Sequence, residues 1–470
     1  MTLAVQEQTG TGIARNGGVD AAALLTVYVC LLWFIPSPMV VSALGSAGSP
    51  ATLFGIGIFL FWAWHTVRRA EHSDGRSHPV RAAMLGLIVA TLVVYAHAMA
   101  GPLPGDEIST ADSGLLRLLS LAGVVLLACD GISDYDRLVT VLRRLAFAAG
   151  LVALLGLAQY VTGELFVDRI RIPGLTAGTE GWTLGTRSGR IRPGGTSMSP
   201  IEYGVVLGMA LPLAAVCASV QSRYRWIYRA MLVAMIASIF FSMSRSAYLC
   251  SLAGMIVLAL SWDVRRRLRA LGFLAAVSAV MYVTVPGLLG SIQGLFSNAG
   301  EDPSIASRTG SYDIAGAFIS SSPWVGKGFG TFLPKYWILD NAYLGTTIET
   351  GFLGLVALLT LIVAGLVSAR QARKTLQAEQ DAARAAGYDA GLGEHIQYAQ
   401  AVLASVAAGA CGLAFFDAFA FPQTAGCFFL FIGLAGAMRR ITRASADVAG
   451  GSDDQKSGTP APRSASPGRD

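Results

Sequence analysis

Long apolar runs alternate with short polar breaks along the whole chain. A helix of about 20 apolar residues spans the hydrocarbon layer of a membrane, which is about 30 Å thick. The pattern predicts twelve transmembrane helices and an all-α, polytopic membrane protein with one large external loop. The predicted spans lie near residues 21–36, 49–66, 80–100, 112–130, 138–161, 198–219, 225–243, 246–262, 268–286, 341–368, 397–417 and 420–438.

Basic side chains in the connections set the predicted orientation. With twelve spans, six basic clusters fall on one side, and the positive-inside rule makes that side the cytoplasm. We therefore predict a multi-pass protein of the plasma (inner) membrane with both termini cytoplasmic. The clusters are Arg68, Arg69, Arg76 and Arg81; Arg137, Arg143 and Arg144; Arg223, Arg225 and Arg229; Arg265, Arg266, Arg267 and Arg269; Arg370, Arg373 and Lys374; and Arg439, Arg440 and Arg443.

The predicted organisation follows from these spans. Residues 1–20 form a cytoplasmic segment, 21–286 hold helices one to nine with an external loop near 162–197, and 287–340 form the large external loop. Residues 341–438 hold the last three helices. A stretch rich in Ala, Gln and Glu, 371–395, predicts a surface helix on the cytoplasmic side. The tail 439–470 is predicted to be disordered, because from Ser445 onward it is rich in Ser, Gly, Pro and charge.

Composition narrows the functional classes. The chain has 470 residues, of which 53% are hydrophobic and 14% charged, with a mean hydropathy of +0.55. A soluble domain averages about 25% charged residues. The net charge of +6 arises from the orientation clusters, so we predict no nucleic-acid partner. The six cysteines lie in or beside apolar runs, and the histidines lack ligand spacing, so neither a metal nor a cofactor is predicted.

Several arginines fall on the predicted outer side despite the basic bias of the inner one. They are Arg187, Arg190, Arg192, Arg245 and Arg308. They could pair with acidic residues of their own loops or with lipid phosphates, or they could converge on an anionic ligand, since guanidinium binds phosphate in a bidentate way. Arg245 is the clearest candidate, because it lies in a very short turn between two apolar runs, where a charge is costly.

A second polar group opens the tenth predicted span. On a helix, Asn341, Gly345 and Glu349 share one face at spacing i, i+4 and i+8. Asp340 stands at the mouth of this helix, where it could act as a general base or as a helix cap. Glu349 lies deeper, and we expect it to be a partner of an arginine or a buried protonated acid.

The large external loop is expected to be ordered, since it contains several aromatic residues and glycines; a helix is predicted over residues 307–320. Ionisable residues of the spans fall toward their outer ends rather than at mid-depth, where an ion-coupled transporter would place them. This distribution favours ligand capture or chemistry at the outer membrane boundary.

Three segments, in this order, resemble the O-antigen ligase and O-antigen polymerase-like family of lipid-linked glycan transferases. They are Arg192 to Gly204 (RPGGTSMSPIEYG); Ser242 to Ala247 (SMSRSA); and Ser307-Arg308 followed by Pro323 to Phe332 (PWVGKGFGTF) and by Asp340 to Leu344 (DNAYL), with Glu349 and Gly351. The resemblance covers roughly residues 185–360 by motif and most of the chain by topology.

The resemblance implies an inverting, metal-independent transfer from an undecaprenyl-diphosphate-linked glycan to a glycan or lipid-glycan acceptor. It assigns Arg245 and Arg308, with Asp340, to catalysis, and Arg190, Arg192, Asn341, Tyr343 and Glu349 to substrate binding. Ligases of the family commonly have His where this chain has Asp340, so polymerisation and ligation both stay open. The other hypotheses are a transporter or flippase of lipid-linked sugars and a non-catalytic scaffold of a polysaccharide complex.

Overall fold

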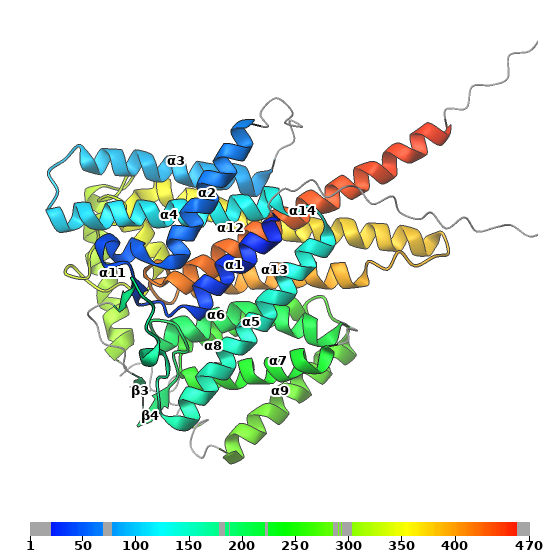
Figure 1. Cartoon of the computed structure of the whole chain (residues 1–470), viewed down its shortest axis with the longest axis horizontal. Helices are drawn as coiled ribbons and strands as arrows, with labels where there is room; N and C mark the ends of the chain where they lie inside the picture. Colours follow the sequence, from blue (N-terminus) through cyan, green and yellow to red (C-terminus); the bar gives the residue numbers. More distant parts are fainter. Residues whose placement is uncertain are drawn as a thin grey trace, which may run out of the picture.

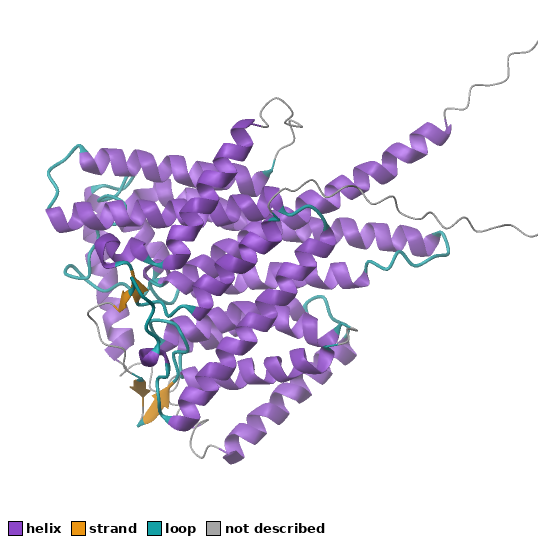
Figure 2. Ribbon diagram, in the orientation of Figure 1, coloured by secondary structure: helices purple, strands orange, loops and turns teal. Residues whose placement is uncertain are grey.

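The computed structural model describes residues 20–68, 78–177, 184–187, 189–220, 224–284, 290, 293 and 303–457, with the backbone alone for 284, 303–309 and 446–457. Helices make up most of the described residues (Figure 2). Many of them run along the long axis of the molecule, and the short strands gather with α11 toward one end (Figure 1).

Each predicted span overlaps one helix. The helices are α1 (Ala21–Phe34), α2 (Pro50–Arg68), α3 (Pro79–Met99), α4 (Gly105–Gly131), α5 (Tyr135–Thr162), α6 (Pro200–Ser219), α7 (Arg225–Ser242), α8 (Arg245–Ala259), α9 (Val264–Thr284), α12 (Ala342–Ala385), α13 (Gly393–Gly412) and α14 (Pro422–Ser457); α11 (Pro303–Ser321) lies in the predicted external loop. The expected helix at 307–320 is confirmed by α11.

Eight helices in the described residues are long and apolar enough to cross a membrane: α2 to α7, α12 and the first part of α14. The helices α1 and α8 are apolar but have only 14 and 15 residues. The chain is therefore a multi-pass, all-α membrane protein, while the count of twelve spans stays a prediction.

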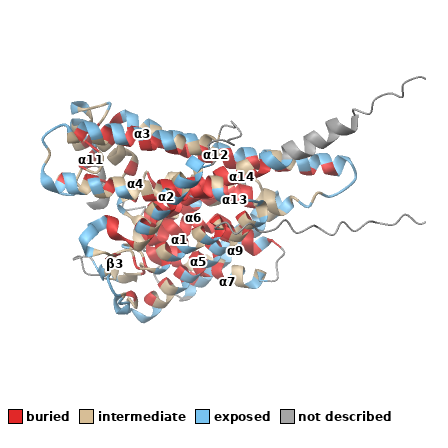
Figure 3. Cartoon of the chain, turned by 45° about the horizontal axis from the view of Figure 1, so that its top comes forward, coloured by how far each residue is buried: buried red, intermediate tan, exposed pale blue. Residues whose placement is uncertain are grey.

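The core forms around α6 and α14. In the apolar windows of these two helices 89% of the residues are buried, against 22% in α2. Buried residues accordingly concentrate in the middle of the bundle (Figure 3). Outer helices keep large apolar side chains exposed, such as Leu60 and Val89, as expected of surfaces that face lipid.

Two predicted boundaries are wrong. The stretch 371–395 was expected to form a surface helix, but α12 runs on from its break at Gly351 to Ala385, and α13 begins at Gly393. The tail was expected to be disordered from 439, yet α14 reaches Ser457. Ala444, Ala446 and Ala449 favour helix. The prediction used the average composition of the whole tail, which is typical of disorder. The predicted segments 1–19 and 458–470 lie outside the described residues.

Short strands occupy the two connections near the start of α6. Strand β1 (Met39–Val40) pairs with β2 (Thr176–Ala177), and β3 (Gly185–Arg187) pairs with β4 (Arg190–Arg192), both antiparallel. Short 3-10 segments lie at Ser42–Gly48, Val167–Arg169 and Ala418–Ala420, and the first of them is kinked at Gly45. The loop expected near 162–197 therefore contains ordered hairpin structure.

The helix α12 is broken at Gly351, where φ is 61° and ψ is −166°. Residues 322–328, which we call the strap, lie against the break. The amides of Lys327 and Gly328 donate to the carbonyls of Ile348 and Glu349 at 2.8 and 2.9 Å. In return, the amides of residues 352 and 353 donate to the carbonyls of residues 323 and 324 at 2.8 and 3.1 Å. The strap thus pairs backbone groups that the break would leave open.

Glycine is required on both sides of this contact. A Cβ on Gly351 would lie 2.3 Å from the carbonyl carbon of Trp324, and one on Gly326 would lie 2.5 Å from that of Glu349. Both residues also have positive φ. The glycines of this part of the family motif therefore have a structural role, because they let two backbones approach closely.

Ion pairs attach the same loop to the start of α4. The carboxylate of Glu107, whose side chain is 1% exposed, accepts hydrogen bonds from the ammonium of Lys327 and the hydroxyl of Tyr336. Lys335 pairs with Asp106 at 2.6 Å in an exposed position. The loop before α12 is therefore held by backbone bonds on one side and by a buried ion pair on the other.

Candidate active site

Three arginines share one face of the β3–β4 hairpin. Arg187 is the cross-strand partner of Arg190, and Arg192 lies two residues further along the same strand. Directly opposite residues and residues at i and i+2 project to the same side of a sheet. Burial and the nearby charge of Arg187 lower the pKa of the Arg192 guanidinium to about 10. An anion at this face would relieve the repulsion.

The turn between α7 and α8 places a buried cation at a helix N-terminus. Met243 adopts a left-handed conformation with φ of 45°, and the Ser244 hydroxyl then caps α8 by accepting from the Ala247 amide at 3.4 Å. Arg245 is the first residue of α8 and is only 9% exposed. The positive end of the helix dipole disfavours a cation there and favours an anion.

A hydrogen bond joins the hairpin to this turn. Nε of Arg192 donates to the carbonyl oxygen of Ser242 at 2.7 Å. Its Nη2 is buried and has no hydrogen-bond partner among the described residues. The structure thus brings Arg192 to the turn that carries Arg245, and leaves a buried guanidinium donor of Arg192 available to a ligand.

A buried polar network fixes the segment that follows Arg192. The Gln159 side chain donates to the Gly195 carbonyl at 2.9 Å and accepts from its amide at 2.8 Å. The Gln423 amide group bonds both Thr196 and Ser197, at 3.1 and 2.6 Å. Glutamines 159 and 423 were absent from the predicted site. The sequence signal that could have identified each of them is an uncharged polar residue in an otherwise apolar segment.

Glu202 belongs to this network rather than to the ligand face. Its side chain is fully buried, and its two carboxylate oxygens accept from the amides of Met198 and Gln423 at 2.8 and 2.7 Å. The start of α6 is thereby tied to the start of α14. The network fixes residues 195–197, which follow Arg192 along the chain.

The start of α12 corrects one expectation. Asn341 caps the helix, because its Oδ1 accepts from the amides of Tyr343 and Leu344 at 3.0 and 3.1 Å. Asp340, which was considered for this role, precedes the cap. The hydroxyl of Tyr343 donates to the Ala410 carbonyl of α13 at 2.7 Å. The Asn341 side chain is thus engaged in capping α12, and the Tyr343 side chain in holding α12 against α13.

Two carboxylates lie near Arg117 of α4, and a third lies near one of them. Arg117 interacts electrostatically with Glu349 and with Asp417, and Asp417 interacts in turn with Asp340. Glu349 also accepts hydrogen bonds from the amides of residues 330 and 332. We call Arg117, Asp340, Glu349 and Asp417 the acidic cluster. Arg117 and Asp417 were not among the predicted site residues, and the expectation for Glu349, an arginine partner or a buried protonated acid, stays a prediction.

Asp417 lies outside the helices, in the connection between α13 and α14. Burial raises the pKa of its carboxyl to about 6, and the charge of Asp340 acts in the same direction. A carboxylate of this kind is ionised at neutral pH yet accepts a proton more readily than an ordinary aspartate. The sequence signal for it was a lone charge between two apolar runs.

The connection after α13 links the two groups of residues. The Ser246 hydroxyl of α8 donates to the Phe415 carbonyl at 3.2 Å, and the Ala342 amide of α12 donates to the Leu413 carbonyl at 2.8 Å. The starts of α8 and α12 therefore meet the same five-residue stretch, 413–417. Arg245 and Asp340 stand beside its two contacts.

Two predicted site residues are less closely defined. Arg190 lies partly exposed on the hairpin. Arg308 lies in α11, and its side chain is outside the described residues. The helix α11 packs against the start of α12 through Ala315, Leu339 and Ile348. Within the described residues, no three His, Cys, Asp or Glu side chains form a group that could hold a metal ion.

The comparisons with known proteins identify the central part of the chain. Residues 230–359 match the Wzy_C family model, which is described as O-antigen ligase. The matched region runs from α7 to the first turns of α12 after the break, so it contains Arg245, the strap and Asp340, while the hairpin lies outside it. A search of curated proteins gave no match. The chain is thus a helical membrane protein with an O-antigen ligase domain of the Wzy_C family over residues 230–359.

Proposed function

We propose that this protein is a membrane glycosyltransferase that polymerises or ligates a glycan carried on a lipid diphosphate of the undecaprenyl type, in cell-surface polysaccharide synthesis. The observation that supports this most directly is the bond from Arg192 to Ser242. It brings the half-buried guanidinium group of Arg192 to the turn that carries the buried Arg245 and the N-terminus of α8, which is an arrangement suited to a diphosphate.

In the proposed reaction, an acceptor hydroxyl oxygen attacks the anomeric carbon of the donor sugar. The bond between that carbon and the phosphate oxygen breaks, and its electron pair leaves with the lipid diphosphate. Arg192 and Arg245 stabilise the charge that develops there, with Arg187, Arg190 and Arg308 as further cations. One preorganised donor of this kind contributes on the order of 3 kcal/mol. Because guanidinium groups supply the positive charge, the reaction needs no metal.

The acidic cluster is the proposed acceptor side. Asp340 takes the proton of the acceptor hydroxyl, and Asp417 is its electrostatic neighbour. General base catalysis of this type contributes about 10²- to 10⁴-fold in rate. The starts of α8 and α12 both bond to the stretch 413–417, so the proposal has donor and acceptor meet beside it.

We place this site at the external membrane face. The hairpins and α11 lie at one end of the bundle, and the arginine-rich end of α14 lies at the other (Figure 1). By the positive-inside rule the arginine-rich end is cytoplasmic. A single cysteine introduced at exposed Thr186 should then react with a membrane-impermeant maleimide in intact spheroplasts, whereas one introduced at exposed Arg443 should react only after lysis.

Transfer is tested with purified protein in nanodiscs, a lipid-diphosphate-linked oligosaccharide and an acceptor. Arg245→Ala and Arg192→Ala should each slow transfer by about 10². The control is Arg169→Ala, since Arg169 is an exposed arginine of the same long loop that pairs with Glu164. Folded Arg245→Ala protein that transfers at the wild-type rate would contradict the proposal. A chelator should leave the rate unchanged.

A deletion strain separates the two reactions. Short surface glycans indicate a missing polymerase, and long glycans that stay on the lipid carrier indicate a missing ligase. Translocation of lipid-linked glycan in proteoliposomes, with no new glycosidic bond, would favour a flippase instead.

A further inference from the structure

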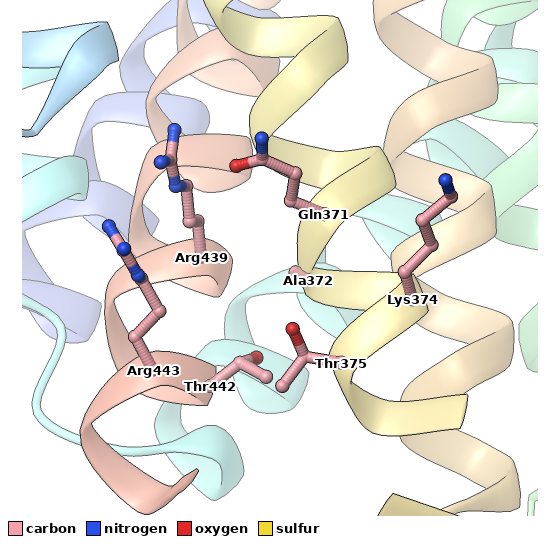
Figure 4. A pocket seen from close by; sticks show the side chains of 7 residues that line it. All are labelled: Gln371, Ala372, Lys374, Thr375, Arg439, Thr442 and Arg443. Atoms are coloured by element: carbon pink, nitrogen blue, oxygen red, sulfur yellow. The ribbon is translucent and has the colours of Figure 1, made fainter. Parts of the chain in front are cut away.

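A basic cavity of about 300 Å³ lies between α12 and α14 (Figure 4). On α14 its lining includes Arg439, Thr442 and Arg443, and on α12 it includes Gln371, Ala372, Lys374 and Thr375. Arg439 is 17 residues after the start of α14, which corresponds to about 25 Å along a helix. The cavity is therefore separate from the arginines of the hairpin.

The lining of the cavity is cationic. Arg439 and Arg443 stand one turn apart and interact repulsively with each other. Figure 4 shows their side chains side by side, with Gln371 directed toward Arg439 and the two threonines facing each other. In the described part of the chain neither arginine forms a hydrogen bond or an ion pair, and no acidic residue lines the cavity. Such a lining suits an anion and offers no partner for an ammonium group.

An exposed apolar stripe on α12 leads to this cavity. Val356, Leu359, Val363 and Val367 are 59%, 41%, 55% and 38% exposed. Their spacing of three, four and four residues keeps them on one face of the helix, and the next position on that face is Gln371. An apolar stripe that ends at a basic cavity matches the two parts of a phospholipid, its acyl chains and its headgroup.

We propose that this cavity binds the phosphate of an anionic phospholipid headgroup, with the acyl chains along the stripe of α12. The phosphate diester contacts Arg439 and Arg443, and the hydroxyls of the headgroup contact Gln371 and Thr375. Basic pockets between membrane helices recognise anionic headgroups in this way. The inference does not depend on the proposed transferase activity.

The test measures thermal unfolding of the purified full chain in detergent with added phosphatidylglycerol, phosphatidylcholine or inorganic phosphate. Phosphatidylglycerol alone should raise the unfolding midpoint, and native mass spectrometry should show its retention. In Arg439→Gln/Arg443→Gln protein, the lipid concentration needed for half of the shift should rise about tenfold. Arg384→Gln is the control, since Arg384 is an exposed arginine of α12 that pairs with Asp381.

A second variant guards against misfolding of the first. Gln371→Glu changes an exposed position and adds a negative charge to the lining, so it should weaken phosphatidylglycerol binding in a folded protein. Equal binding by wild type and both variants would overturn the proposal. It would also be overturned if inorganic phosphate gave the whole effect, or if phosphatidylcholine stabilised the protein as much as phosphatidylglycerol.

Discussion

Arg192 donates from Nε to the carbonyl oxygen of Ser242 at 2.7 Å, across 50 residues of sequence. The carbonyl belongs to the last residue of α7, where unpaired backbone oxygens and the negative end of the dipole favour a cation. One guanidinium nitrogen is thus used for attachment, while a second, Nη2, stays buried and available. Nε therefore fixes the position of the Arg192 side chain, while Nη2 is the atom proposed to bind the ligand.

Arg192→Lys should separate these two roles. Lysine keeps the charge but has a single ammonium, so it cannot hold the Ser242 carbonyl and bind a phosphate with a planar fork. We expect about tenfold slower glycan transfer, against about 10² for Arg192→Ala. Initial rates in nanodiscs at saturating acceptor measure this. Equal rates for Arg192→Lys and wild type would show that charge alone suffices.

Gly351→Ala should disturb the contact between α12 and the strap. A Cβ at this position would lie 2.3 Å from Trp324, and φ is positive. We expect a loss of at least about 2 kcal/mol, measured as a lower midpoint of thermal unfolding. Gly316→Ala in α11 is the matched control, because a Cβ there meets open space. It should be neutral or slightly stabilising.

Glu107→Gln should loosen the loop before α12. It leaves Lys327 without its buried partner, and breaking a buried ion pair costs about 3 to 5 kcal/mol. Hydrogen exchange of amides 323–333 should become faster, while that of α6 stays unchanged. Asp106→Asn removes an exposed pair with Lys335 and should cost no more than about 1 kcal/mol. Similar exchange in both variants would argue against the Glu107 anchor.

Asp417→Asn should change the dependence of stability on pH. Because burial holds the pKa of Asp417 near 6 in the folded protein, above the ordinary value of about 3.9, the folded state loses stability as pH rises between these two values. The amide removes that cost. The variant should match wild type near pH 4 and exceed its stability at pH 7.5, by at most about 3 kcal/mol. Thermal unfolding at both pH values measures the difference.

Much of the fold follows from local pattern. The apolar runs predicted twelve spans, and the structure has a helix at each of them. A moderately apolar stretch in the long loop predicted α11. The continuation of α12 to Ala385 and of α14 to Ser457 was missed. A membrane helix need not end where its apolar run ends, and Ala-rich sequence carries it further into water.

The site was only partly readable from sequence, because its decisive contacts join distant segments. A short turn with a buried charge identified Arg245, and the structure joins that turn to Arg192. The charged neighbours of Glu349, by contrast, are Arg117 on α4 and Asp417 after α13. Nothing in the local sequence pattern of either segment indicates that these residues lie near Glu349. The cap at Asn341 rather than Asp340 depends on one residue of register, which a span boundary drawn from hydropathy does not resolve.

The break in α12 has a consequence for biosynthesis. Residues 322–328 leave the ribosome before Gly351 does, so the segment that completes the backbone pairing of the break is synthesised first. The strap is therefore already synthesised when α12 enters the bilayer, so its backbone groups can pair at once with those that the break leaves open. Moving this segment downstream of α12 by circular permutation would remove that head start while leaving every native contact possible.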